Sequence, residues 1–279
     1  YYFNGAYIKR EDVDAGSCES RVFQQATQYY AVCDGMGGAD AGEDASYRVV
    51  SELGTILSRS DPMEAAGSFD REIQVLSNAI YDAARARGIH SGTTLAMLAL
   101  CDLSAYSVNV GDSRVYLARK GALRQLSIDH SEVQRMISMG VITPEEGRTH
   151  PRRHVISQYL GMPSDDARVS ATMSKAVVPE AGDWFLLCSD GLTDMVENWE
   201  IQSILQKAGT AAAAAKALKD AALSRGGKDN VTVLCLRVMR VSPHSRLRAL
   251  CRFLAASVLF TASSLGALIY FLLDWLASR

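Results

Sequence analysis

The sequence predicts an α+β protein, because blocks of helical periodicity and blocks of short strands alternate along it. Nearly half of the 279 residues (48%) are hydrophobic, which is enough to build a large core. The net charge is −2, and no basic stripe occurs before the C-terminus. We therefore expect no nucleic acid as a partner, since phosphate backbones require a concentrated basic face.

Two amphipathic helices are predicted in the first third of the chain. Apolar residues of the first recur at helical spacing: Ala45, Val49, Leu53, Ile56 and Leu57. Those of the second do the same: Phe69, Ile73, Leu76, Ile80 and Ala83. The break at Asp61-Pro62 predicts that the two helices pack antiparallel on one side of a sheet.

Short β-type runs follow these helices. Four of them, 93–101, 105–110, 113–121 and 122–127, predict an antiparallel meander with a turn at Gly111-Asp112. A helix is expected over 131–139, then a polar, mobile flap over 143–162. Two more strands within 183–191 and 230–239 are separated by helices over 199–207 and 211–224.

Four aspartates occur where an apolar run ends beside glycine: Asp34 in "CDGMGG", Asp112 in "VGDS", Asp190 in "CSDG" and Asp229 in "GKDN". Each alone is an ordinary turn residue. Together, with no matching lysine cluster, they need a cation to offset their repulsion. Hard divalent cations such as Mg²⁺ and Mn²⁺ prefer such oxygen ligands, so the four predict a metal site.

Five motifs, in order, resemble those of the metal-dependent serine/threonine protein phosphatases (protein phosphatase type 2C), particularly the bacterial members. They are "DGMGG" with the following "GE.AS", "SGTT", "VGDSRVYLARKGALRQLSIDHS", "DWFLLCSDGLTD" and "GGKDNVTVL", and the similarity runs from about Gly5 to Met239. The resemblance implies a central β-sandwich of two antiparallel sheets flanked by paired helices, with metals in a cleft at one end.

The resemblance also implies the roles of the aspartates. Asp34 would bridge two metals, the Gly35 carbonyl would help to hold one, and Asp190 and Asp229 would complete the first metal's ligands. Asp112 with Asp190 would hold a third, giving two or three Mn²⁺ or Mg²⁺ ions per domain. Such ions activate a water for in-line attack on a phosphoserine or phosphothreonine of a partner protein. The substrates would be proteins phosphorylated by a serine/threonine kinase.

The first motif of the family, Arg-x-x-Asn-Glu-Asp, is altered in "YIKREDVDAG". One register places Asp14 on the Asp of that motif, which supports the metals, Val13 on its Glu and Lys9 on its Arg, so that Lys9 or Arg10 would contact the substrate phosphate. The other offers Glu11-Asp12 as the acidic pair but leaves Tyr7 where the Arg belongs. We prefer the first register. A lysine holds phosphate as a point charge without a bidentate fork.

The chain also has Met36 where eukaryotic members carry a proton-donating histidine. Either solvent or metal-held water protonates the leaving group, or one of His130, His150 and His154 reaches the site. Arg148, Arg152 and Arg153 on the flap are candidates to contact a phosphopeptide, with a solvated loop as the alternative.

The C-terminal sequence departs from this picture. Residues 253–273 contain no charge and are long enough to cross the roughly 30 Å hydrocarbon core of a membrane as a helix. We therefore expect a phosphatase domain over 1–241, a basic juxtamembrane linker over 242–252 and a transmembrane helix over 253–273. Arginines before the helix predict a single-pass C-terminal anchor with the catalytic domain in the cytoplasm.

Three functions remain open on these grounds. The first is a membrane-tethered phosphatase that uses a two-metal site. The alternative is a catalytically weak relative that binds phosphoproteins as a scaffold or regulator, which Val13 and the missing Arg allow. A third is hydrolysis of another phosphoester, such as a nucleotide or small metabolite.

Overall fold

The computed structural model describes residues 1–7, 20–23, 27–60, 66–101, 104–163 and 168–241. Residues Tyr1–Met239 form one compact unit. Its strands make two main antiparallel sheets and a two-stranded ribbon of β4 (Gly35–Met36) and β5 (Gly92–Thr93). The six-stranded sheet has the order β10 (Thr172–Met173), β7 (Ser104–Val110), β6 (Leu95–Cys101), β3 (Thr27–Val32), β1 (Tyr2–Phe3) and β2 (Ala6–Tyr7). The four-stranded sheet has the order β12 (Val233–Arg237), β11 (Trp184–Cys188), β8 (Arg114–Arg119) and β9 (Ala122–Gln125).

The two sheets pack face to face, and the central strands of each sheet are buried on both faces. In β6, Leu95 and Met97 face one apolar cluster whereas Ala96 and Leu98 face another. Successive side chains of a strand point to opposite faces, so each central strand contributes to two layers of core. In β11, Phe185 and Leu187 face the other sheet, and the alternate residues pack against helices. This pattern explains why these strands read as continuous apolar runs.

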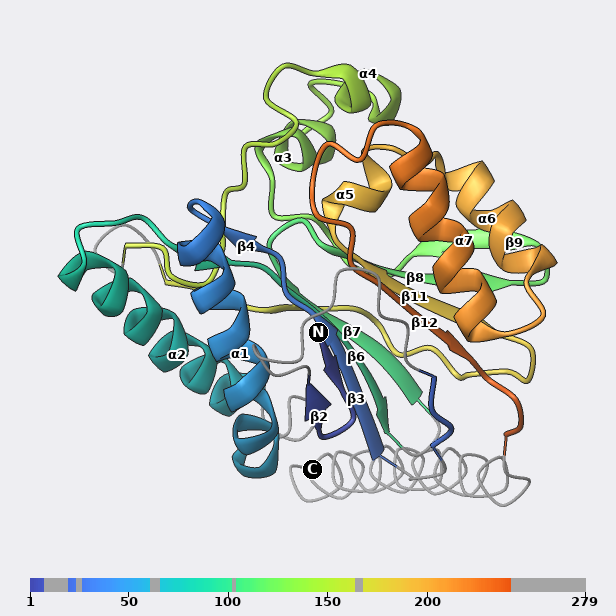
Figure 1. Cartoon of the computed structure of the whole chain (residues 1–279), viewed down its shortest axis with the longest axis horizontal. Helices are drawn as coiled ribbons and strands as arrows, with labels where there is room; N and C mark the ends of the chain where they lie inside the picture. The colour runs from blue at the N-terminus through green and yellow to red at the C-terminus, as the bar shows by residue number, and fades with distance from the viewer. Residues whose placement is uncertain (8–19, 24–26, 61–65, 102–103, 164–167, 242–279) are drawn as a thin grey trace, which may run out of the picture. The chain divides into compact units, whose positions relative to one another are not determined.

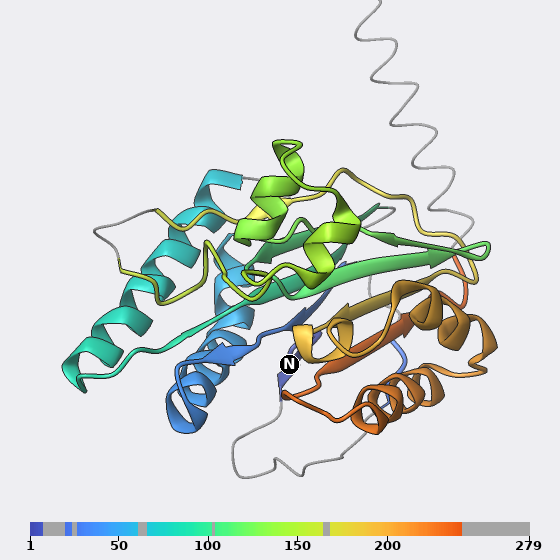
Figure 2. The same ribbon diagram turned by 90° about the horizontal axis from the view of Figure 1, so that it is seen from above.

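Helices cover the outer face of each sheet. On the six-stranded sheet lie α1 (Ala39–Arg59) and α2 (Ala66–Ala86), and on the four-stranded sheet lie α6 (Asn198–Lys207) and α7 (Ala211–Ser224) (Figure 1). The view from above shows the same order of layers (Figure 2). The predicted helices are therefore confirmed, and α7 has the bounds expected from the sequence.

Three shorter helices lie toward one end of the sandwich (Figure 1): α3 (Glu132–Ser138), α4 (Pro144–Thr149) and α5 (Asp190–Thr193). The sequence predicts α3 but not α4, which begins inside the polar flap. The missed signal is a capping box, in which Thr143 and Glu146 bond each other's backbone N–H groups. Pro at the first turn adds to it.

The predicted four-stranded meander is wrong in its topology. β6 and β7 pair in the six-stranded sheet, whereas β8 and β9 pair in the four-stranded sheet. Gly111, at φ +101°, turns the chain from β7 in one sheet to β8 in the other. The crossing places Asp112 at the edge between the sheets.

The predicted fold class also needs correction where it adds a transmembrane helix. In the part of the chain that the structure describes, no helix is long and apolar enough to cross a membrane. The fold is accordingly α+β, built from sheets and helices as above. The segment 253–273, which carried that prediction, and the linker 242–252 lie outside the described residues.

Candidate metal centre

Asp34 follows β3 and is fixed by its backbone to the start of β6. Its N–H donates to Thr94 Oγ1 (3.0 Å), and its carbonyl accepts from the Thr94 N–H and from Thr93 Oγ1 (both 2.9 Å). Thr94 Oγ1 also bonds Ser113 Oγ at 2.7 Å, beside Asp112. These bonds fix the backbone that carries the Asp34 carboxylate.

A pair of glycines lets α1 close onto the residue after Asp34. A Cβ on Gly35 would lie 2.0 Å from the carbonyl oxygen of Gly42 in α1, and a Cβ on Gly42 would lie 2.6 Å from the Gly35 carbonyl carbon. Only residues without a Cβ permit this approach. The glycine cluster thus shapes the backbone around the Gly35 carbonyl, the predicted metal ligand.

Asp190 and Asp229 are joined by the residues next to them. Ser189 lies between β11 and Asp190, and its N–H donates to the Thr232 carbonyl at 3.1 Å. Its Oγ donates to the Asn230 carbonyl and accepts from the Thr232 N–H, both at 3.1 Å. Gly191 packs against the same loop, because a Cβ there would lie 2.4 Å from the Asn230 oxygen. The loop carrying Asp229 is therefore pinned to the end of β11.

His130 supports the turn before Asp112. Its N–H donates to the Gly111 carbonyl at 2.8 Å, and its Nδ1 accepts from the Gly111 N–H at 3.3 Å. Its Nε2 bonds Thr172 Oγ1 at 2.7 Å. Burial lowers the pKa of this imidazole, which favours the neutral form. His130 is thus occupied in holding the turn.

The predicted carboxylates affect one another's protonation. Burial raises the pKa of Asp34 to about 8, with further contributions from Asp190, Asp229 and Asp112. The pKa of Asp112 rises to about 7, again first through burial and then through Asp190. Burial also raises the pKa of Asp190. The structure therefore brings all four predicted aspartates into one region of concentrated negative charge.

Two observations indicate that this region is suited to bind metal ions. Oδ1 of Asp190 is buried and has no hydrogen-bond partner. Among the described residues, no Lys or Arg forms an ion pair with any of the four aspartates. Uncompensated carboxylates of this kind suit hard divalent cations, which take oxygen ligands.

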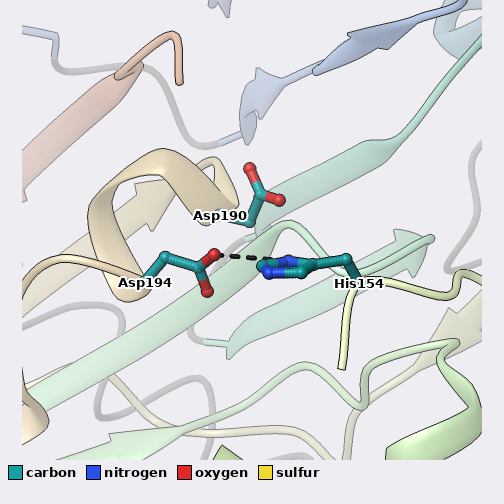
Figure 3. A group of neighbouring side chains, drawn as sticks. All are labelled: His154, Asp190 and Asp194. Atoms are coloured by element: carbon teal, nitrogen blue, oxygen red, sulfur yellow. Dashed lines mark ion pairs between the residues drawn. The ribbon is translucent and has the colours of Figure 1, made fainter. Parts of the chain in front are cut away.

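Among the described histidines, His154 lies with the Asp190 carboxylate. Its Nδ1 is 3.3 Å from Asp194 Oδ2, and one possible ligand atom from each of His154, Asp190 and Asp194 lies within 4.8 Å of the other two (Figure 3). Asp194 follows α5, one turn after Asp190. His150 instead accepts the Arg152 N–H within its own loop.

The residues predicted for the first motif, Lys9, Arg10 and Asp14, lie outside the described residues. Sequence reasoning missed the positioning roles of Thr93, Thr94 and Ser189. The signal was present as "SGTT" and as the Ser before Asp190, but a hydroxyl's partner in another strand cannot be read from spacing.

Replacing Thr94 by Val is expected to lower kcat and metal affinity by about 10- to 100-fold, the usual cost of losing a partner that orients a ligand. The change leaves the Asp34 N–H without its acceptor. Thr94→Ser keeps the hydroxyl and serves as the control. Calorimetric titration with Mn²⁺ together with phosphate release measures both effects. Equal behaviour of the Val and Ser variants would contradict the role.

Comparison with known proteins agrees with this geometry. The protein phosphatase 2C family pattern matches residues 13–224. Protein phosphatase PhpP of Streptococcus pneumoniae is 34% identical over 206 residues, covering 72% of this chain and 82% of PhpP. Serine/threonine protein phosphatase PstP of Mycobacterium tuberculosis is 37% identical over 218 residues, covering 75% of this chain and 40% of PstP.

Solved structures give the same result. Serine/threonine phosphatase Stp1 from Staphylococcus aureus superposes with a TM-score of 0.69 at 34% identity, covering 77% of this chain and 84% of that one. The catalytic domain of PstP in complex with two manganese ions superposes with a TM-score of 0.64 at 31% identity, covering 80% and 96%. The chain belongs to the protein phosphatase 2C family of metal-dependent serine/threonine protein phosphatases.

Proposed function

We propose that this chain removes phosphate from phosphoserine and phosphothreonine in proteins through a site that holds two divalent cations, Mn²⁺ or Mg²⁺. The observation that carries the proposal is the gathering of Asp34, Asp112, Asp190 and Asp229 with no ion-paired Lys or Arg among the described residues. Family membership supports the reaction class, and the two manganese ions in the related PstP domain support the metal count.

Asp34, Asp190 and Asp229, with the Gly35 carbonyl, are the residues that would hold the two ions. Asp112 with Asp190 would hold a third. When bound, divalent cations lower the pKa of water and neutralise phosphoryl oxygens. The chain's part is to orient these oxygens: Thr93 and Thr94 fix Asp34, and Ser189 fixes the Asp229 loop beside Asp190.

The partners we propose are proteins phosphorylated by a serine/threonine kinase. Lys9 or Arg10 is proposed to contact the substrate phosphate and Asp14 to assist the metal site. The membrane localisation, with the domain in the cytoplasm, was inferred from residues that the structure does not describe and stays a prediction, as does the division into 1–241, 242–252 and 253–273.

The test is hydrolysis of para-nitrophenyl phosphate and of a phosphothreonine peptide by the full chain, with Mn²⁺ and with chelator. We expect turnover that requires the metal and is faster with the peptide. Metal binding without turnover of either substrate would overturn the proposal and favour the scaffold that the altered first motif permits. Turnover of para-nitrophenyl phosphate without turnover of the peptide would favour hydrolysis of another phosphoester.

A further inference from the structure

The three flap arginines differ in how their guanidinium groups are used. Here the flap is the segment 143–162. Arg148 pairs with Glu197 at 2.6 Å. Arg152 contacts Glu132 through two nitrogens, Nε to Oε2 at 2.6 Å and Nη2 to Oε1 at 2.7 Å. Arg153 is exposed, and its side chain forms no ion pair or hydrogen bond with any residue in the described ranges.

The backbone around Arg153 is anchored beside the carboxylates. Arg148 pairs with Glu197 at the start of α6, and Nδ1 of His154 lies 3.3 Å from Asp194 Oδ2 at the end of α5. Both partners lie in the short stretch that begins at Asp190. His154 lies with Asp190 and Asp194, as Figure 3 shows. Arg153 is the residue before His154, so its backbone lies at the rim of the candidate metal centre.

We propose that Arg153 is a specificity-determining residue that binds an acidic side chain of the substrate next to the phosphorylated Ser or Thr. This inference rests on the proposed phosphatase function and adds the class of protein substrate. The occupant is a carboxylate, because an arginine fork matches carboxylate geometry and no carboxylate among the described residues takes that place on Arg153. An unpaired rim cation selects partners by charge complementarity.

The chemistry separates this role from a contact with the reacting phosphate. A residue that grips the transferred phosphoryl group acts on every substrate, including a small aryl phosphate. A residue that binds a flanking carboxylate acts only on peptides that carry one. The measured quantity is therefore the preference ratio, defined as kcat/KM for an acidic peptide divided by kcat/KM for its neutral counterpart.

The experiment uses phosphothreonine peptides with a single Glu, Gln or Lys scanned through the positions on either side of the phosphothreonine, and para-nitrophenyl phosphate as the small substrate. The full-length wild type, Arg153→Gln, Arg153→Glu and Arg124→Gln are compared with Mn²⁺. Arg124 is an exposed arginine on β9 in the four-stranded sheet and serves as the matched control.

At one of the scanned peptide positions, Arg153→Gln is expected to lower the preference ratio about two- to five-fold, which is the range expected for loss of an exposed ion pair. The change should come mainly from KM. Arg153→Glu should transfer the preference to the Lys peptide, and Arg124→Gln should keep the wild-type ratio. A wild-type preference ratio of one at every scanned position would overturn the inference. So would an unchanged preference ratio in Arg153→Gln, or an equal loss of kcat/KM for para-nitrophenyl phosphate in that variant. Absence of any metal-dependent hydrolysis in the wild type would instead reject the proposed function beneath it.

Discussion

Asp34→Asn is expected to reduce phosphate release by more than about 100-fold, because losing a ligand exceeds the 10- to 100-fold cost of losing its supporting partner. The amide could not supply the charge that the Asp34 carboxylate would give to the proposed pair of cations. The measurement is kcat with saturating Mn²⁺, together with calorimetric Mn²⁺ binding. Retention of at least a tenth of the wild-type kcat would contradict the central position of this residue.

The same substitution should stabilise the metal-free protein at pH 8. The pKa of Asp34 is raised from an ordinary carboxyl value to about 8 in the folded chain. Between about pH 4 and pH 8 the folded state therefore binds more protons than the unfolded state, and the free energy of unfolding falls as the pH rises. Asp34→Asn removes this pH-dependent contribution, so the stability of the variant relative to the wild type increases with pH across that range.

Thermal unfolding with chelator at pH 5 and pH 8 tests this sign. The wild type should lose more melting temperature between the two pH values than Asp34→Asn does. Asp82→Asn is the matched control, since Asp82 is exposed on α2. A variant that is less stable than the wild type at pH 8 without metal would contradict the mutual repulsion of these carboxylates. Added Mn²⁺ should reverse the order and favour the wild type.

The helices and the four aspartates could be predicted because they depend on local signals. The 3.6-residue spacing of apolar residues that predicted the second helix, such as Phe69 and Ile73, is visible in α2. An aspartate after an apolar run and beside glycine marks a strand end, and strand ends of one sandwich meet. Asp34, Asp112, Asp190 and Asp229 were found in this way.

The strand partners could not be predicted, because both faces of β7 and β8 are largely buried. An apolar stretch without alternating polar residues does not indicate which sheet its strand joins. The passage of the chain at Gly111 from β7 in one sheet to β8 in the other was therefore predicted as a hairpin within a single meander. The roles of Thr94 and Ser189 were missed for a related reason. Their partners, Asp34 and Asn230, are about 60 and about 40 residues away in the sequence.

Gly191→Ala is expected to separate Asp229 from Asp190 and to lower both stability and turnover. The new Cβ would lie 2.4 Å from the Asn230 carbonyl oxygen, which is backbone and cannot rotate away. Gly191 has no positive φ, so the effect is steric and not a strain of the alanine backbone. Overpacking of this kind costs about 1–3 kcal/mol, or roughly 2–12 °C in melting temperature for a domain of this size.

Movement of the Asn230 backbone carries Asp229 with it, since the two are adjacent and Ser189 holds the same loop. We therefore expect weaker Mn²⁺ binding and a fall in kcat that exceeds the effect of the stability loss at 25 °C. Gly209→Ala is the control, because a Cβ at Gly209 meets no atom within 4 Å. If Gly191→Ala binds Mn²⁺ as the wild type does, the loop adjusts without moving Asp229, and the close packing of Gly191 on Asn230 does not position the ligand.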